Sequence, residues 1–220
     1  MLLSDKFLFI HVDKSAGTSI QRALKPHAHL RADSRLRRRL VWLGGLNRLG
    51  LYRVMEFPEH VNASVVKNCL PAGIYDGLYK FAFVRNPWDR LVSLYAQLIR
   101  DPNDPNLHRN RAANGFENFV RLEIQRNKSH QHTFVCDGNG NLIMDFIGYF
   151  ERLEEDFAKV CHRLGVNAAL PKANPSKHDT YQSYYTPATR EMVAEHYRRD
   201  IEMFGYDFDG IATGTRPAKK

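Results

Sequence analysis

Short apolar runs alternate with stretches of helical periodicity along this chain of 220 residues. Residues 6–12 (KFLFIHV) and 80–86 (KFAFVRN) are rich in aromatic and β-branched side chains, and a helix start follows each run at once. Continuous apolar runs of this length are typical of parallel strands that are buried on both faces. The pattern predicts an α/β fold, with a central, mainly parallel sheet flanked by helices in a single domain over residues 1–220.

The second half of the chain repeats this alternation. Residues 145–150 (DFIGYF) predict another short strand, and residues 151–165 have apolar side chains at helical spacing up to a stop at Gly165. Thr186 followed by Pro187 is an N-cap followed by proline at the first helical position, which predicts a final helix that runs to about residue 204.

Two further elements are predicted before the second strand. Residues 1–12 are expected to form one buried strand and not a secretion signal, because a basic leading segment and a small-residue cleavage site are lacking. Asn62 is expected to begin a helix that Pro71 stops. The predicted buried face of that helix consists of Val65, Val66, Cys69 and Leu70.

The junction after the first strand, KSAGTS, is the first candidate for chemistry. Backbone N–H groups at the start of a helix lack partners, and the helix dipole favours negative charge there. Ala16 and Gly17 allow close approach of the backbone, Thr18 and Ser19 add hydroxyl donors, and Lys14 adds a positive charge. The junction therefore predicts an oxyanion site, with an ordinary turn and a solvent-exposed lysine as the alternative.

This loop differs from the usual loop of nucleoside triphosphate enzymes. In the GxxxxGK[ST] pattern the lysine follows the second glycine, whereas Lys14 precedes the only glycine of the loop. No acidic strand end stands out as a magnesium ligand. A smaller anion than a triphosphate fits the loop better.

The second strand leads into a similar junction, RNPWDRLVS. Asn86 is suited to cap a helix that begins with Pro87. Ser93 lies opposite the apolar face, so Ser93 and Arg85 are placed to converge on a second phosphate. The alternative is an arginine paired with a nearby carboxylate and an exposed serine. The predicted apolar face consists of Trp88, Leu91, Leu94, Tyr95 and Leu98.

Both junctions resemble motifs of one enzyme family. HVDKSAGTS is similar to the 5′-phosphosulfate loop of sulfotransferases, and FVRNPWDRLVSLY resembles their 3′-phosphate motif. The order of the motifs is similar to that in the bacterial branch of the family-2 carbohydrate sulfotransferases, which have a P-loop-like fold. The likeness continues at His60, at residues 145–157 and at residues 184–208, and so covers most of the chain.

The resemblance implies a donor, a product and an acceptor. The donor would be 3′-phosphoadenosine 5′-phosphosulfate, the nucleotide product adenosine 3′,5′-bisphosphate, and the acceptor a hydroxyl of a carbohydrate or glycoconjugate; no metal is implied. The 3′-phosphate would be held by Arg85 and Ser93. Asp13 departs from the proline usual in the family and places a carboxylate beside the anion site. The 5′-phosphosulfate would be held by Lys14, Ser15, Ala16, Gly17, Thr18 and Ser19.

Two catalytic roles follow from the chemistry of sulfuryl transfer. Lys14 is the candidate for stabilising charge on the leaving phosphate, and the acceptor hydroxyl needs a general base. His60 matches a histidine that the family places upstream of its 3′-phosphate strand, so we expect it to be this base. His11 lies in a strand and is expected to be a core residue, while Glu56 and Glu59 are reserve bases.

Charge and cysteine content indicate the class of partner and the cellular compartment. The net charge of +8 indicates an acidic partner, and the arginine-rich segment 31–48 is expected either to line the cleft of an anionic acceptor or to be solvated. No helix-turn-helix, zinc-finger or RNA-binding signature accompanies the charge, so nucleic acid is not expected. The three cysteines form no CxxC pair, and no apolar run approaches the roughly 18 residues of a membrane span. A reducing, cytoplasmic location is therefore expected.

Several residues keep two interpretations. Gln131 and Asn174 fall where the resemblance continues, but surface-loop positions are expected for both. Cys136 lies near two histidines, yet a second close cysteine for a metal site is lacking. For the whole chain, a kinase that uses a nucleoside triphosphate and a non-catalytic module that binds a nucleotide or polyanion remain the alternatives. Tyr181, Tyr184 and Tyr185 are expected to stack on adenine or a sugar ring, or to pack against the final helix.

Overall fold

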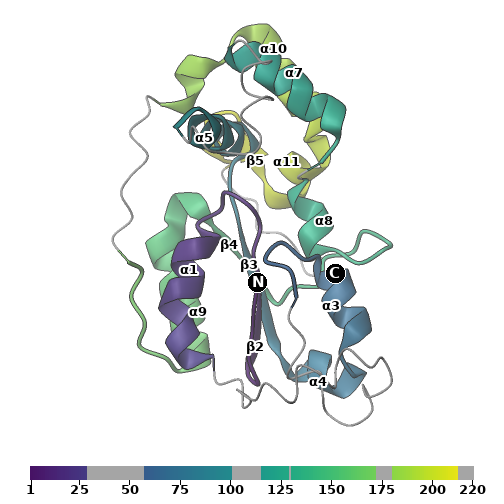
Figure 1. The fold of residues 1–220 in the computed structure, drawn as a ribbon, viewed down its shortest axis with the longest axis vertical. Helices are drawn as coiled ribbons and strands as arrows, with labels where there is room; N and C mark the ends of the chain where they lie inside the picture. The colour runs from purple at the N-terminus through teal and green to yellow at the C-terminus, as the bar shows by residue number, and fades with distance from the viewer. Residues whose placement is uncertain (29–56, 101–114, 129, 172–179, 213–220) are drawn as a thin grey trace.

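The structure is a computed structural model that describes residues 1–28, 57–100, 115–128, 130–171 and 180–212 (Figure 1). Several predicted features lie outside these residues, namely Glu56, the arginine-rich segment 31–48, and Asn174.

A four-stranded sheet forms the centre of the fold. Its strands are β1 (Leu2–Leu3), β2 (Phe7–Ile10), β3 (Tyr79–Val84) and β4 (Phe146–Tyr149), which lie side by side in this order. β3 is parallel to both β2 and β4, and only β1 runs antiparallel to its neighbour. The predicted α/β architecture with a mainly parallel sheet is confirmed.

The side-chain alternation along β2 and β3 separates the two faces of the sheet. Phe7, Phe9, Phe81 and Phe83 pack with α1 (Gly17–Leu24) and α9 (Leu153–Leu164) on one face (Figure 1). The alternate, aliphatic positions face α3 (Ala63–Cys69), α4 (Ala72–Gly77) and α8 (Gln131–Val135). Because both faces are covered, β2 and β3 read as continuous apolar runs.

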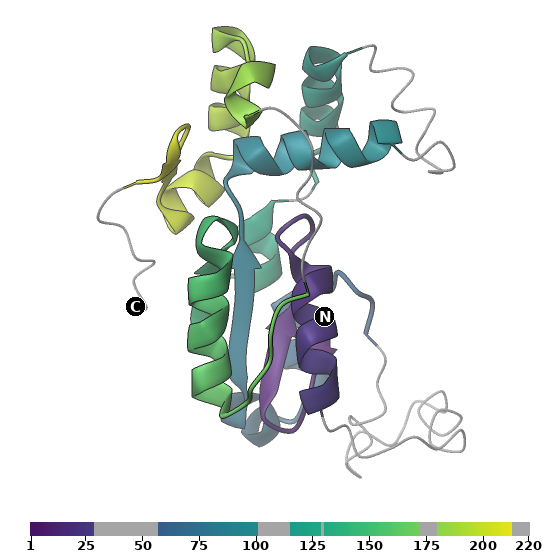
Figure 2. The same cartoon turned by 90° about the vertical axis from the view of Figure 1, so that its left-hand side faces the viewer.

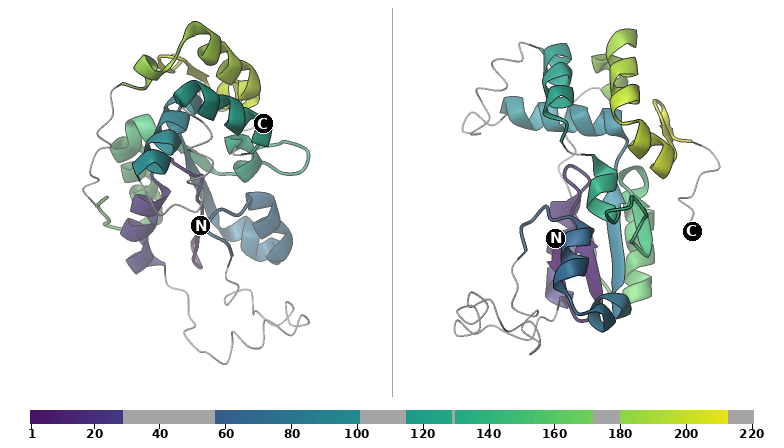
Figure 3. Two further views of the ribbon diagram at one scale, coloured as in Figure 1. Left: turned by 45° about the horizontal axis from the view of Figure 1, so that its top comes forward. Right: turned by 90° about the vertical axis from the view of Figure 1, so that its right-hand side faces the viewer.

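A layer of helices lies over the carboxyl end of the sheet. α5 (Pro87–Arg100) crosses this end, and α7 (Phe116–Arg126) and α10 (Pro187–His196) stand on it (Figures 2 and 3). The predicted apolar face of α5 packs into the core of this layer. The remaining elements are the 3₁₀ turns Lys25–His27, Phe150–Arg152 and Tyr181–Tyr184, the helix α11 (Arg198–Phe204), and the hairpin of β5 (Tyr206–Asp207) and β6 (Gly210–Ile211).

The helix boundaries follow local signals. Asn86 Oδ1 accepts the Trp88 N–H at 3.0 Å, so Asn86 caps α5 as predicted. Thr186 and Thr189 form a reciprocal capping box at the start of α10, and Gly165 ends α9 in the left-handed region with φ 65°.

Three predictions about these elements are wrong in detail. The amino-terminal strand is split into β1 and β2, because Ser4 Oγ accepts the N–H groups of Lys6 and Phe7 and turns the chain back on itself. Val65 is 45% exposed, so it does not share the buried face of α3. The final helix breaks at Tyr197, which divides α10 from α11.

Candidate active site

The loop between β2 and α1 has an unusual backbone. Lys14 (φ 65°) and Ala16 (φ 62°) both lie in the left-handed region that L-residues seldom adopt. Ala16 is also the N-cap of α1, where its methyl group offers no oxygen to the helix. Strained backbone of this kind is concentrated at binding sites, where the surrounding structure maintains it.

The amino terminus of α1 therefore keeps its donors available. The Ile20 N–H makes the first intrahelical bond, to the Ala16 carbonyl at 3.1 Å, and no side chain of the described residues caps the helix. The N–H groups of Gly17, Thr18 and Ser19 precede that bond. Together with Lys14, they form a set of donors suited to a small oxyanion.

Gly17 is needed here because of a close neighbour and not because of its backbone angles. A Cβ at this position would overlap the ring of His11, which is buried at the end of β2. The sequence predicts that Gly17 allows a close approach to the backbone. In the structure, the group that lies close to Gly17 is the imidazole of His11.

We expect Gly17→Ala to lower stability, because the added methyl group must displace the His11 ring. Overpacking of this kind costs about 1–3 kcal/mol. Thermal unfolding should show the loss, and Gly138→Ala is the matched control because its Cβ would meet no atom within 4 Å. In a His11→Ala background Gly17→Ala should be nearly neutral; an unchanged cost there would contradict the clash.

Arg85 leaves the carboxyl end of β3 and forms a bidentate pair with Asp89. Arg85 Nε and Nη2 donate to the two carboxylate oxygens at 2.7 and 2.8 Å, and the guanidinium lies 3.9 Å from the centre of the Phe150 ring. Arg85 is only 5% exposed. The arginine–carboxylate pairing that the sequence left as an alternative is therefore present.

The two junctions touch each other. Arg85 Nη1 donates to the Lys14 carbonyl at 3.3 Å, and Lys14 Nζ donates to Gln97 Oε1 at 2.6 Å. Asp89, Ser93 and Gln97 are spaced by four residues and share one face of α5. Because Asp89 and Gln97 both reach this loop region, Ser93 lies between them on the helix face turned toward it. Ser93 is 9% exposed, so it lies off the apolar face as predicted but is not a surface residue.

His60 lies near the end of β2, where the loop to α1 begins. Its Nδ1 is 3.2 Å from the carbonyl oxygen of His11, the residue that follows β2. Because a carbonyl oxygen can only accept, Nδ1 donates in this contact, and in a neutral imidazole Nε2 is then the nitrogen with the lone pair. His60 is exposed, and this tautomer is the one a general base requires.

His11 is less suited to that role. Burial lowers its pKa to about 4, with a further contribution from the neighbouring His60. Its Nδ1 lies 3.1 Å from Glu59 Oε1 but is not aligned for a hydrogen bond. His11 is thus a neutral, buried residue at physiological pH, as the sequence predicts. One ligand atom from each of His11, Glu59 and His60 lies within 4.8 Å of the others, so the three are within reach of a single ion.

Gln131 was misjudged from the sequence as a surface-loop residue. It is fully buried, and its side-chain amide pairs with the backbone of Arg85. The tyrosines pack in the upper layer instead of remaining open: Tyr185 Oη donates to the Trp88 carbonyl, and the Tyr184 ring contacts Tyr95. The contacts of Tyr184 and Tyr185 are thus to α5, whereas the sequence predicted stacking on a ligand ring or packing against the final helix.

A second histidine group lies near α8. One ligand atom each of His130, His132 and Asp200 falls within 4.8 Å of the others. Cys136 is not part of this group, because its thiol contacts the Met203 sulfur at 3.7 Å. The Asp200 carboxylate accepts the backbone N–H groups of Gln131 and His132, so it already anchors the start of α8.

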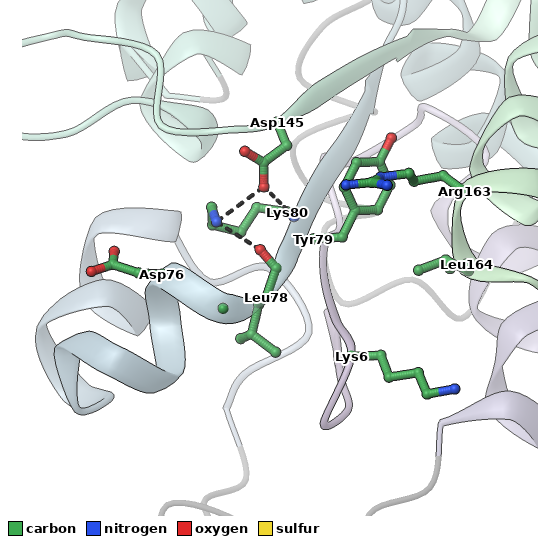
Figure 4. Close-up of a pocket in the computed structure, with 9 residues that line it drawn as sticks. Lys6, Asp76, Leu78, Tyr79, Lys80, Asp145, Arg163 and Leu164 are labelled. Carbon is green, nitrogen blue, oxygen red and sulfur yellow. Dashed lines mark hydrogen bonds and ion pairs between the residues drawn. The ribbon is translucent and has the colours of Figure 1, made fainter.

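A pocket of about 530 Å³ lies at the opposite, amino-terminal edge of the sheet (Figure 4). Lys80 Nζ binds Asp145 Oδ2 at 3.0 Å and the Leu78 carbonyl at 2.7 Å, so its charge is paired there. None of the predicted donor-binding residues lines this pocket.

In the described part of the chain, no helix is long and apolar enough to span a membrane.

Comparisons with known proteins agree with this geometry. The model of the sulfotransferase family matches residues 3–207. An uncharacterized protein of Archaeoglobus fulgidus is 33% identical over 123 residues, which are 54% of this chain and 96% of that protein.

One solved structure shares the fold at low sequence identity. The structure of mouse sulfotransferase SULT7A1 complexed with PAP is 15% identical, with a TM-score of 0.54, over 91% of this chain and 85% of the mouse chain. A sulfotransferase from Alicyclobacillus acidocaldarius is 16% identical over 92% of this chain and 94% of the other, with a TM-score of 0.41.

Proposed function

Because this chain belongs to the sulfotransferase family, we propose that it moves a sulfuryl group from 3′-phosphoadenosine 5′-phosphosulfate to a hydroxyl of a carbohydrate or glycoconjugate. In this proposal Lys14, Ser15, Ala16, Gly17, Thr18 and Ser19 hold the 5′-phosphosulfate, and Arg85 and Ser93 hold the 3′-phosphate.

The observation that carries the proposal is the contact between the two junctions. An uncapped helix start with a lysine at its entrance adjoins the strand end that bears Arg85. One nucleotide that carries phosphates on both the 3′ and the 5′ oxygen of its ribose therefore has charges suited to the two junctions. A complex of the mouse enzyme with PAP is consistent with this donor.

Arg85 retains donors for a phosphate despite its pairing. A guanidinium has five N–H groups, and among the described residues Asp89 takes two and the Lys14 carbonyl takes one. Two remain, on the two terminal nitrogens. Ser93 adds a hydroxyl from the helix face turned toward this region, so the 3′-phosphate would receive a planar cation and a neutral donor.

Lys14 and His60 would divide the chemistry. The S–O bond to the 5′-phosphate breaks while a new S–O bond forms to the acceptor oxygen. Lys14 stabilises the negative charge left on the phosphate oxygen, and the N–H groups at the start of α1 share that charge. His60 Nε2 takes the proton from the acceptor hydroxyl.

Asp13 is the one residue of the loop whose charge opposes an anion. It is partly exposed and, among the described residues, it is not in an ion pair. The negative charge of its carboxylate slightly raises the pKa of His11, against the larger lowering by burial.

A transfer assay tests the proposal. The purified chain would be incubated with 3′-phosphoadenosine 5′-phosphosulfate, a chelator and a panel of saccharides, lipids and small phenols, and in a parallel reaction with ATP, magnesium and the same panel, with the products of both followed by mass. We expect a saccharide to gain one sulfuryl group. Phosphate transfer from ATP that requires magnesium would contradict the proposal in favour of a kinase, and binding without turnover of any acceptor would favour a polyanion-binding module.

A further inference from the structure

Gln131 occupies the space between the two proposed phosphate-binding turns. Its Oε1 accepts the Arg85 N–H at 2.9 Å, and its Nε2 donates to the Arg85 carbonyl at 2.7 Å. Ser15 Oγ lies 3.5 Å from the same Oε1, at the outer limit of a hydrogen bond. A single buried amide thus contacts the backbone of Arg85, the first residue of one turn, and the side chain of Ser15 in the other.

Asp200 fixes the residue that carries this amide. Its Oδ2 accepts the Gln131 N–H at 2.7 Å, and its Oδ1 accepts the His132 N–H at 2.9 Å and lies 2.5 Å from His132 Nδ1. Asp200 is fully buried on α11. A buried carboxylate is stable only with such partners, and these three donors hold the start of α8 in one position.

A series of hydrogen bonds links Asp200 to the loop that contains Lys14. The Asp200 carboxylate accepts the Gln131 backbone N–H, and the Gln131 side-chain amide accepts the Arg85 backbone N–H. Arg85 Nη1 in turn donates to the Lys14 carbonyl. Every side-chain polar atom of Gln131 has a partner. Buried hydrogen-bond networks favour one arrangement of their members, so this one favours a fixed spacing of the two turns.

We propose that Gln131 is a positioning residue that couples the two phosphate-binding turns, and that Asp200 holds it in place. This rests on the proposed function, because the spacing of the turns matters only for a ligand that spans both. A nucleotide with two phosphates then meets turns that are already aligned. Without Gln131, binding must also order them, at a cost in affinity.

Three nucleotides separate this role from a general loss of structure. Adenosine 3′,5′-bisphosphate engages both turns, whereas 5′-AMP and 3′-AMP each engage one. In Gln131→Ala we expect affinity for the bisphosphate to fall about 10- to 100-fold, within the range of typical coupling between sites. Affinity for each monophosphate should fall no more than about threefold, because one phosphate does not require the spacing. Calorimetric titration of all three ligands gives these values.

Further variants guard against misfolding. Asp200→Asn keeps the shape but weakens the anchor, and should show the same pattern with a smaller loss, about three- to tenfold for the bisphosphate. Gln125→Ala, on the exposed side of α7, should match the wild type. Thermal melting of each variant confirms that it is folded. Equal weakening of all three ligands in folded Gln131→Ala, or no loss for the bisphosphate, would overturn the proposal.

Hydrogen exchange distinguishes failure of this proposal from failure of the proposed function. In the ligand-free protein, Gln131→Ala should speed amide exchange in residues 20–24, the hydrogen-bonded part of α1, which follows the Lys14 loop and is not bonded to Gln131. If the wild type binds the bisphosphate no better than 5′-AMP while this exchange effect is present, the donor assignment is wrong but the coupling stands. If exchange in residues 20–24 is unchanged, the coupling is wrong.

Discussion

Lys14→Ala is expected to lower the turnover rate about 10²- to 10³-fold, the size of loss seen when a donor to a developing oxyanion is removed. Lys14 extends from the strained loop ahead of α1 to Gln97 of α5, and so lies at the entrance of the proposed donor site. The charge on the leaving phosphate is largest in the transition state. The rate should therefore fall further than the affinity for adenosine 3′,5′-bisphosphate, which we expect to drop about tenfold.

The matched control for this variant is Lys25→Ala. Lys25 is exposed and follows the other end of α1, about 12 Å along the helix from its start. Its removal should leave both rate and affinity unchanged. A Lys14→Ala protein with full turnover, or one that loses only a little affinity while its binding becomes more sensitive to salt, would point to a passive polyanion-binding surface.

His60→Asn is expected to lower the turnover rate about 10²- to 10⁴-fold, the usual contribution of a general base. The asparagine amide can still donate to the His11 carbonyl, as His60 Nδ1 does, but it offers no basic lone pair. The contact that positions the residue is thus kept while the proton acceptor is lost. Affinity for the donor should change little.

The comparison with Glu59→Gln identifies the base. Glu59 is the reserve carboxylate among the described residues, and its oxygen lies near His11. A larger loss in Glu59→Gln than in His60→Asn would transfer the role to the carboxylate. His162→Asn, at an exposed position near the end of α9, is the control and should behave as the wild type.

Local signals made the two junctions predictable. Asn86 and Pro87 specify the start of α5 by capping and by proline's preference for the first turn, which depend on a few neighbouring residues. The mainly parallel character of the sheet was accessible for a similar reason, since buried runs between helices imply parallel strands. The sequence placed Lys14 and Arg85 at the ends of two strands. It did not show that these two strand ends contact each other, because that contact depends on the fold.

Residues held by distant partners were not predictable. Gln131 reads as polar and loop-like in SHQHTF, and its burial depends on Asp200, 69 residues further on, and on the end of β3. Val65 fits an apolar stripe by spacing alone, but the sheet covers only one side of α3. The need for Gly17 comes from the ring of His11, whose position follows from the course of β2. No local pattern encodes these contacts.

The assignment of one nucleotide to both junctions is tested most directly by titrating the purified wild-type chain with adenosine 3′,5′-bisphosphate and with 5′-AMP. The 3′-phosphate would gain charge-assisted hydrogen bonds from Arg85 and the Ser93 hydroxyl, each worth about 1.5–3 kcal/mol to a charged group. The account predicts that the bisphosphate binds at least about tenfold more tightly than 5′-AMP. Equal affinity for the two nucleotides, or no binding of either, would contradict it.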